Sequence, residues 1–385
     1  MSTPNQSLAE RVQAVSRQAI AEQRIVGSVV LVAQQGKVIY AEASGYADRE
    51  LQRPMRRETQ FRLSSVSKPY ITLAAMRMVE QQKLGLDDAV SRWLPWFTPA
   101  LADGRQPEIK IRHLLSHTAG LDYRFNQPAE GQYQRLGVQD GMELSSLTLE
   151  QNLRLLAQAD LLVAPGSEFH YSLAIDVLGA VLEQVAGEPL PQLFKRWVAQ
   201  PLGLGNTGFS TTDAENLATA YHDTAVPPEP IHDGMHLTLP EGFGFDIELS
   251  PSRALDPLAY ASGGASMVGD ADDVLRLVET LRGGGEGILQ PASVALMRQA
   301  HVGAEAETQG PGWGFGFGGA VLVDAELAAT PQHNGTLQWG GVYGHSWFYD
   351  PQAALSVVAL TNTAFEGMSG MYPQQIRDAV YGVQR

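Results

Sequence analysis

The sequence of 385 residues contains no cysteine. Disulfide bonds, thiolate catalysis and cysteine-ligated zinc sites are therefore excluded. Charged residues make up only 18% of the chain, and the 42 acidic residues outnumber the 27 basic ones, for a formal net charge of −15. Because an acidic surface repels the phosphates of nucleic acids, we expect no nucleic-acid partner.

Long apolar runs are also missing. No stretch approaches the ~20 uninterrupted apolar residues that a membrane-spanning helix needs. The first residues, MSTPNQSLAERVQAVSRQAI, are polar where a signal peptide has an apolar core. We therefore expect no membrane partner and a cytoplasmic location, or a periplasmic one if a signal peptide preceded the given chain. The sequence predicts no particular oligomeric state.

Strand patterns lie near both ends of the chain. VGSVVLVAQ and KVIYAEAS flank Gln35-Gly36, which is the signal of a β-hairpin. Towards the C-terminus, WGFGFGGAVLV, GTLQWGG, HSWFYD and LSVVALTNT indicate successive strands. Helical patterns at 7–23 and 373–381 accompany these two groups. The two ends of the chain are therefore predicted to build one sheet.

The middle of the chain carries mainly helical patterns. They predict helices at 71–84 (ending at Gly85), 111–116, 147–158, 172–186 and 190–198. The predicted fold class is α+β: an antiparallel sheet built from both chain termini and flanked by helices, plus a mostly helical inserted domain. We place the sheet domain at 1–75 and 255–385 and the helical domain at 76–254. The active site is expected in the cleft between them.

The stretch FRLSSVSKPY packs three serines and a lysine into five positions. On a helix, Lys68 reaches Ser65 three residues earlier and Ser64 four residues earlier. Pro69 is tolerated only near the start of a helix, so the helix should begin at about Ser65. A helix N-terminus stabilises the negative charge of an attacked carbonyl. The S-x-x-K pattern alone is a weak signal, because a capping serine followed by a solvated lysine looks the same.

Further motifs follow in order: LLSHTAGLDY, PGSEFHYSLAIDVLGAVLEQVAG, PLGLGNTGF, ASGGASMVGDADDV and LQWGGVYGHSWF. Together with FRLSSVSK they resemble the serine β-lactamase and penicillin-recognising superfamily. Within it the chain is most similar to the family VIII carboxylesterases, which look like class C β-lactamases. The resemblance covers most of the chain. It implies a β-lactamase/transpeptidase-like fold and a serine hydrolase that uses no cofactor and no metal.

The resemblance also implies roles for particular residues. Ser65 would be the nucleophile, and Tyr171 with Lys68 would form its general base. A lysine with an ordinary pKa of ~10.4 is protonated and needs such a partner. The backbone N–H groups of Ser65 and Val342 would form the oxyanion hole.

The chain departs from the penicillin-recognising pattern in two places. Leu173 stands where Y-x-N has an asparagine, and leucine cannot bind a substrate amide. Trp339-Gly340-Gly341 stands where Lys-Thr-Gly is usual, so an apolar wall with one N–H replaces a cation, and the glycines let an edge strand approach the substrate. We therefore expect a carboxylesterase for small acyl or aryl esters. Its expected substrate contacts are Trp339, Gly340, Gly341, Leu173 and Tyr123.

Other readings stay open. One is a weak class C-like β-lactamase or D-alanyl carboxypeptidase in which Arg124 or another cation replaces the lost lysine. Others are an acyltransferase of the same fold and a non-catalytic binding protein. A Ser-His-Asp hydrolase is disfavoured, because GHSWF lacks the last glycine of a nucleophile elbow and Asp350-Pro351 follows it. His113 and His117 have helical zinc spacing, but HLLSH lacks the glutamate and a third ligand.

Overall fold

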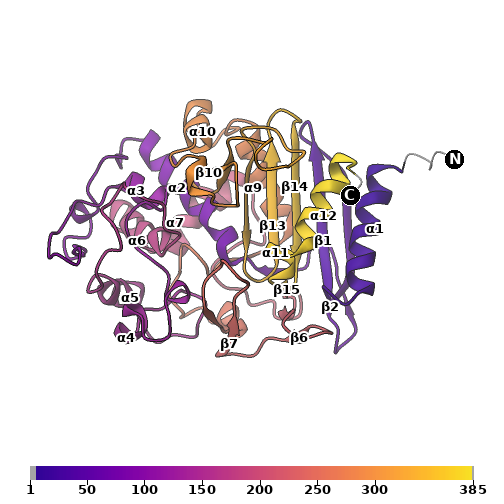
Figure 1. Ribbon diagram of the computed structural model, residues 1–385, viewed down its shortest axis with the longest axis horizontal. Helices are drawn as coiled ribbons and strands as arrows, with labels where there is room; N and C mark the ends of the chain where they lie inside the picture. The colour runs from indigo at the N-terminus through magenta and orange to yellow at the C-terminus, as the bar shows by residue number, and fades with distance from the viewer. Residues whose placement is uncertain (1–5, 384–385) are drawn as a thin grey trace.

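The computed structural model describes residues 6–383, and its largest element is an eight-stranded antiparallel sheet in the order β10-β11-β12-β13-β14-β1-β2-β3 (Figure 1). The N-terminal strands are β1 (Gly27–Gln34), β2 (Lys37–Asp48) and β3 (Arg53–Pro54). The C-terminal strands are β10 (Trp313–Phe315), β11 (Ala320–Leu322), β12 (Leu337–Gly341), β13 (His345–Asp350) and β14 (Leu355–Thr361). Because β1 pairs with β14, the two chain ends share one sheet, which confirms the predicted fold class.

The hairpin of β1 and β2 shows why the local prediction succeeded. Its two linking residues, Gln35 and Gly36, have φ values of 53° and 80°. Positive φ at both central positions defines the two-residue turn whose twist matches paired strands. Alternate residues of β1 then face opposite sides of the sheet. Val30 and Val32 join one apolar core, and Leu31 joins another.

Helices cover both faces of the sheet. On the outer face, α1 (Leu8–Ala21) and α12 (Met371–Tyr381) lie together against β2 and β14 (Figure 1). On the inner face, α9 (Ala271–Arg282) packs against β1, β13 and β14. Asp270 caps the N-terminus of α9 by accepting a hydrogen bond from the Asp273 N–H.

The helical part of the molecule surrounds α2 (Lys68–Glu80) and α6 (Ala174–Ala186), which pack against each other. The other α-helices are α3 (Ile111–Leu115), α4 (Gln132–Leu136), α5 (Leu149–Leu156), α7 (Leu190–Phe194), α8 (Gln200–Leu202), α10 (Pro291–Arg298) and α11 (Glu366–Ser369). Short 3₁₀ turns span Ser64–Ser67, Val90–Arg92, Arg124–Asn126, Pro251–Leu255 and Ala304–Ala306. No helix in the described part of the chain combines the length and apolar character needed to cross a bilayer.

Short strands form three small sheets beside the main one. They are β4 (Phe61–Arg62) with β9 (Val268–Gly269), β5 (Tyr221–His222) with β6 (Glu229–Pro230) and β15 (Thr363–Ala364), and β7 (Met235–Thr238) with β8 (Asp246–Leu249). The weak strand signal in the middle of the chain missed β5 to β8. These strands are only two to four residues long, so no alternation develops in them.

Two predicted helix boundaries are wrong. The helix expected to end at Gly85 ends at Glu80, because Gln82 adopts a left-handed conformation (φ 56°) and breaks the helical run. The single helix expected over 190–198 is interrupted after α7 by a π-helical turn, Lys195–Ala199, before α8 begins.

Candidate active site

The S-x-x-K serine lies in a tight turn that leads directly into α2. The 3₁₀ turn Ser64–Ser67 is followed by the α-helix from Lys68, with Pro69 in its first turn. The helix start predicted near Ser65 is therefore confirmed, although its first turn is 3₁₀. The Val66 N–H donates to the Leu63 carbonyl over 3.0 Å and closes the turn. The Ser65 N–H precedes this first closing bond, so it belongs to the turn's unsatisfied donors.

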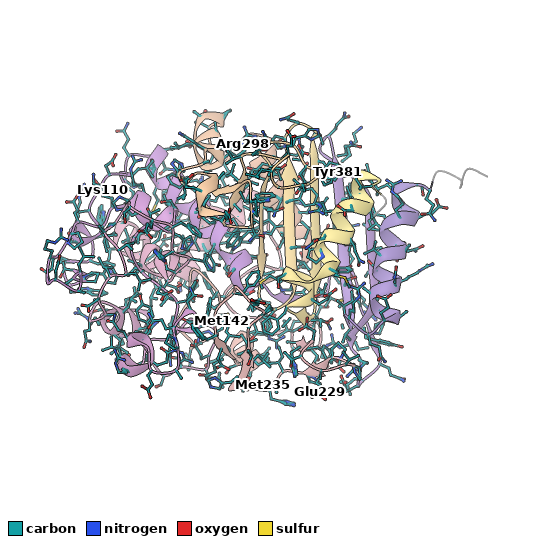
Figure 2. The ribbon with its side chains drawn as sticks, in the orientation of Figure 1. Lys110, Met142, Glu229, Met235, Arg298 and Tyr381 are labelled. Carbon is teal, nitrogen blue, oxygen red and sulfur yellow. The ribbon has the colours of Figure 1, made fainter. Side chains whose placement is uncertain are left out.

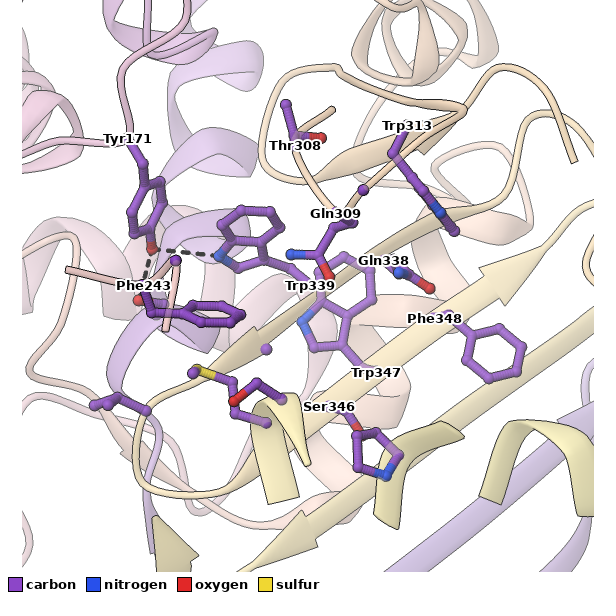
Figure 3. Close-up of a pocket in the computed structure, with 18 of the residues that line it drawn as sticks. Tyr171, Phe243, Thr308, Gln309, Trp313, Gln338, Trp339, Ser346, Trp347 and Phe348 are labelled. Carbon is purple, nitrogen blue, oxygen red and sulfur yellow. Dashed lines mark hydrogen bonds between the residues drawn. The ribbon is translucent and has the colours of Figure 1, made fainter. Parts of the chain in front are cut away.

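The Ser65 hydroxyl is held between two polar side chains. Lys68 Nζ donates to Ser65 Oγ over 3.0 Å, and Tyr171 Oη donates to the same oxygen over 2.7 Å. Lys68 also donates to the Gly264 carbonyl over 2.9 Å and is almost fully buried. Trp339 Nε1 donates to Tyr171 Oη over 3.3 Å (Figure 3). The serine, the lysine and the tyrosine that the sequence singled out therefore lie in one hydrogen-bonded network, and Trp339 extends it.

Aromatic rings surround the lysine. Its Nζ lies 4.5 Å from the centre of the Tyr171 ring and 5.3 Å from that of Tyr123. Such faces attract an ammonium group. Tyr123 stacks on Phe125 with a centroid distance of 4.6 Å. Burial holds the pKa of the Tyr123 hydroxyl well above its usual range, so this predicted contact residue stays a neutral proton donor.

His117 supports the segment that carries Tyr171. Its ring lies 4.8 Å from the Tyr171 ring, and its Nδ1 accepts the Ser172 N–H over 3.2 Å. Burial, reinforced by the charge of Lys68, holds the pKa of His117 well below its usual range. A neutral imidazole can accept that bond, so the histidine in LLSH is a positioning residue beside the site. From the sequence, His117 was notable only for its helical spacing from His113.

A buried carboxylate lies behind the lysine, and the sequence analysis missed it. Asp176 is in the first turn of α6. A Cβ added to Gly264 would lie 2.7 Å from Asp176 Oδ2 and 3.6 Å from Lys68 Nζ. Gly264 therefore lies between the two charged groups and, having no side chain, lets them lie close together. Burial raises the pKa of Asp176 to about 6, while the Ser262 hydroxyl and the Lys68 charge limit the rise. An acidic residue within the apolar run AIDVLGAVL was the available signal.

The raised pKa of Asp176 predicts a pH-dependent stability. Between pH ~4 and ~6 the folded protein retains a proton that the unfolded chain has lost, so this group's contribution falls by about 3 kcal/mol as pH rises. Asp176→Asn removes that titration. The unfolding free energy of the variant minus that of the wild type should therefore increase between pH 4 and 7, as measured by urea denaturation. Asp160→Asn, at an exposed position, serves as the control. If the difference in unfolding free energy between Asp176→Asn and the wild type does not change with pH, the prediction is wrong.

The two glycines of the W-G-G segment allow a close approach of strand and turn. A Cβ on Gly341 would lie 2.5 Å from both the Leu63 carbonyl oxygen and Ser64 Oγ. A Cβ on Gly340 would lie 2.5 Å from a carbonyl oxygen of β13. Only glycine therefore lets the end of β12 lie against the turn that carries Ser65.

The W-G-G segment was expected on an edge strand, and this prediction is wrong in part. β12 lies inside the sheet, between β11 and β13. However, β11 pairs only with Leu337 and Gln338 of β12. Trp339, Gly340 and Gly341 extend beyond that pairing, so this half of the strand has a locally free edge. Val342 follows in the turn to β13, which the Gly344 N–H closes on the Gly341 carbonyl over 2.9 Å.

One predicted substrate contact, Leu173, and the alternative cation, Arg124, are not in the site. Leu173 is fully buried in the apolar core, where its N–H donates to the Asp122 carbonyl, so the prediction of a substrate contact is wrong. The Arg124 guanidinium lies 2.8 Å from the Glu248 carboxylate and 3.7 Å from that of Glu143. It is therefore neutralised by acidic partners and does not replace the missing third-motif lysine.

Ser65 opens into a cavity of about 790 Å³ between the helical part and the sheet. Met142, one of its lining residues, lies near the middle of the molecule (Figure 2). Around the serine the wall is mostly aromatic and aliphatic: Tyr123, Phe125, Phe169, Tyr171, Leu239, Phe243, Trp339 and Val342. Leu239 and Phe243 belong to the β7–β8 connection, which the sequence analysis missed.

The remaining motifs considered in the sequence have other positions in the structure. The residues of GHSWF run directly into the straight strand β13, where a nucleophile elbow requires a strand–turn–helix. Trp313 lines the cavity, while Phe315 packs against Trp339 and His117. His113 Nδ1 accepts the Lys110 N–H over 3.1 Å.

A serine with adjoining lysine and tyrosine, set between an antiparallel sheet and a helical part, defines the class of penicillin-recognising serine hydrolases. Residues 12–380 match the family model described as Beta-lactamase, so the chain belongs to the beta-lactamase family. It is 52% identical over 375 residues to "Esterase EstB" of Burkholderia gladioli, covering 97% of this chain and 95% of that protein. These matches confirm the resemblance to family VIII esterases and the assignment as a serine hydrolase.

Solved structures agree with this assignment. "EstCE1, a hydrolase with promiscuous acyltransferase activity" has a TM-score of 0.97 and 84% sequence identity, covering 99% of this chain and 100% of that one. An unliganded simvastatin synthase from Aspergillus terreus has a TM-score of 0.74 at 22% identity, with 98% of each chain covered. The second likeness supports the fold alone.

Proposed function

We propose that this chain is a serine carboxylesterase that cleaves neutral esters of small acyl groups through an acyl-enzyme on Ser65. The observation that carries the proposal is the pair of hydrogen bonds on Ser65 Oγ, 3.0 Å from Lys68 Nζ and 2.7 Å from Tyr171 Oη. Both side chains are within the reach required of a general base. The similarity to Esterase EstB supports the ester substrate.

For attack, the lysine and tyrosine together must carry one proton fewer than when both donate to Ser65. The Tyr171 oxygen then accepts the Ser65 proton. The positive charge of Lys68 beside the ring and the N–H of Trp339 both stabilise negative charge on that oxygen. The pair can therefore act as a base without a histidine.

Acylation then follows in two steps. Ser65 Oγ bonds to the ester carbonyl carbon, and the carbonyl oxygen takes up negative charge facing the N–H groups of Ser65 and Val342. The bond to the alkoxy oxygen breaks, and the leaving alkoxide takes the proton from Tyr171. A water molecule repeats the sequence on the acyl-enzyme and releases the acid. We also propose that the sheet part (1–75 and 255–385) and the helical part (76–254) are two domains with the active site in the cleft between them, since both supply residues to this cavity.

The charge of the cavity favours a neutral substrate. Among its described lining residues, the charged ones are Glu307 and Arg377. The Arg377 guanidinium is paired with the Asp378 carboxylate over 2.7 Å. A β-lactam or a D-alanyl peptide brings a carboxylate, which needs a cation that this wall does not offer. The esterase is therefore favoured over the β-lactamase and the peptidase.

Acyl transfer to an alcohol is the second candidate. The printed description of EstCE1 names a promiscuous acyltransferase activity, and the apolar wall formed by Phe125, Phe169, Leu239 and Phe243 favours an organic alcohol over water at the acyl-enzyme. Formation of a transfer product when an alcohol is added to an ester donor would establish this activity.

A substrate panel tests the proposed function. We expect rapid hydrolysis of p-nitrophenyl acetate and butyrate, and turnover of nitrocefin and D-alanyl peptides at least ~100-fold slower in kcat/KM, because their carboxylates lack a partner. Initial rates measured on one enzyme preparation provide the comparison. Rapid nitrocefin turnover with negligible ester cleavage would refute the esterase assignment.

A further inference from the structure

The cavity continues from Ser65 onto the outer face of the sheet. Gln338 lies opposite Phe348, and Gly340 lies opposite Ser346, in the ladder of β12 and β13. Residues directly opposite each other share a face, so Gln338, Ser346 and Phe348 form one floor. Gln338, Ser346 and Phe348 lie together along these strands in Figure 3. We call this region the sheet-face groove and define it by Gln309, Gln338, Ser346, Phe348, Pro373 and Gln374, all of which line the cavity.

The cavity, with this groove, offers more space than a small ester requires. The whole cavity of about 790 Å³ is in the range of pockets that enclose drug-sized ligands. The part beside Ser65 already has an apolar wall for the acyl group. The groove continues past Trp339 and Gly340, where β12 runs along the nucleophile turn. It is therefore placed to hold the other half of an ester, the alcohol.

The chemistry of the groove is neutral and polar. Gln309, Gln338 and Gln374 each offer an amide donor and an amide acceptor, and Ser346 offers a hydroxyl. In the described structure, the amides of Gln309 and Gln374 and the Ser346 hydroxyl make no hydrogen bond within the protein, and only the Gln338 carbonyl is engaged, by Gln332 over 3.2 Å. These groups are free to bind a ligand.

The groove also has apolar surface beside its polar groups. Phe348 packs on Tyr381 of α12 and contributes to the floor, while Pro373 adds a wall at the start of that helix. Among the described residues of the lining, the one cation is Arg377, and it is paired with Asp378. Hydroxyl groups around a compact carbon ring match such a surface, because each hydroxyl can both donate and accept while the ring carbons contact the apolar parts.

We propose that the sheet-face groove binds the alcohol portion of the ester and that this alcohol is a neutral polyhydroxylated ring, as in a glycoside. The inference rests on the proposed esterase function and specifies its substrate class. In acylation, the acyl carbon bonds to Ser65 Oγ as its bond to the sugar oxygen breaks. The sugar oxygen takes the proton from Tyr171, and the free glycoside leaves through the groove.

Two acetate esters with different alcohols test this proposal. We expect kcat/KM for methyl 6-O-acetyl-α-D-glucopyranoside to exceed that for ethyl acetate at least ~10-fold. In the double variant Gln338→Ala, Gln374→Ala, the ratio of the two values should fall by about tenfold, mainly through KM, since each lost hydrogen bond changes binding by a factor of roughly 2 to 10. The control Gln192→Ala, which changes an exposed glutamine of α7 outside the cavity lining, should keep the wild-type ratio.

Each outcome decides the proposal. No preference for the sugar ester, or a ratio that the double variant leaves unchanged, would overturn it. If no ester is cleaved at all, the esterase assignment fails, and ligand-observed NMR of methyl α-D-glucopyranoside then decides the groove by itself. Saturation transfer to the glycoside that the double variant abolishes would support the groove as a glycoside site, and absence of transfer in the wild type would overturn it.

Discussion

Ser65→Ala is expected to lower the kcat/KM for p-nitrophenyl acetate by ~10⁶-fold, because no acyl-enzyme can form. The substitution removes one hydroxyl from the lining of the cavity and leaves Lys68 bound to the Gly264 carbonyl. The fold should therefore persist, with an unchanged thermal unfolding midpoint. Stopped-flow and long-time assays of purified protein measure the effect.

Ser64→Ala provides the matched control, because Lys68 could have served either serine on sequence spacing alone. The Ser64 hydroxyl is buried and lies where the close contact with Gly341 occurs, while the hydrogen bonds of Lys68 and Tyr171 go to Ser65. A fluorophosphonate probe should label the wild type and Ser64→Ala, with Ser65 as the modified residue, and should leave Ser65→Ala unlabelled. Labelling of Ser65→Ala would place the nucleophile elsewhere.

The sequence predicted which side chains meet at Ser65 better than it predicted the wall of the pocket. Ser65 and Lys68 are linked by helical spacing, and the resemblance to the family singled out Tyr171. The substrate contacts depend on how distant segments pack. Leu173 is two residues from Tyr171, yet its side chain turns into the core as α6 begins. Spacing along the chain says nothing of that rotation.

The same limit explains the features that the sequence analysis missed. The β7–β8 connection brings Phe243 to the cavity, but its short strands have no periodic pattern to detect. Asp176 becomes notable only because Gly264, from a remote segment, brings it behind Lys68. Conversely, β1 and β2 were predicted accurately, because a two-residue turn with two positive φ values and the apolar run of β1 before it are both local properties.

Tyr171→Phe is expected to lower kcat by ~10²–10⁴-fold, the usual cost of losing general base assistance. Phenylalanine keeps the ring that packs on His117 and faces Lys68, so the change removes only the oxygen that Ser65 and Trp339 contact. In the proposed mechanism, Tyr171 and Lys68 act together as the base, and the Tyr171 oxygen transfers the proton in both acylation and deacylation. Acylation and deacylation should therefore both slow, as burst-phase kinetics with p-nitrophenyl acetate would measure.

Tyr123→Phe separates this role from a general aromatic effect. Its ring also faces Lys68 and packs 5.2 Å from the Tyr171 ring, but the hydrogen bond to Ser65 Oγ comes from Tyr171. We expect kcat to fall by less than about tenfold, the size of one ordinary hydrogen bond. Equal losses of kcat in the two variants, or an unchanged kcat in Tyr171→Phe, would contradict the assignment.

The kcat of Lys68→Ala should match that of Tyr171→Phe within an order of magnitude, because a base built from a shared proton fails when either partner is removed.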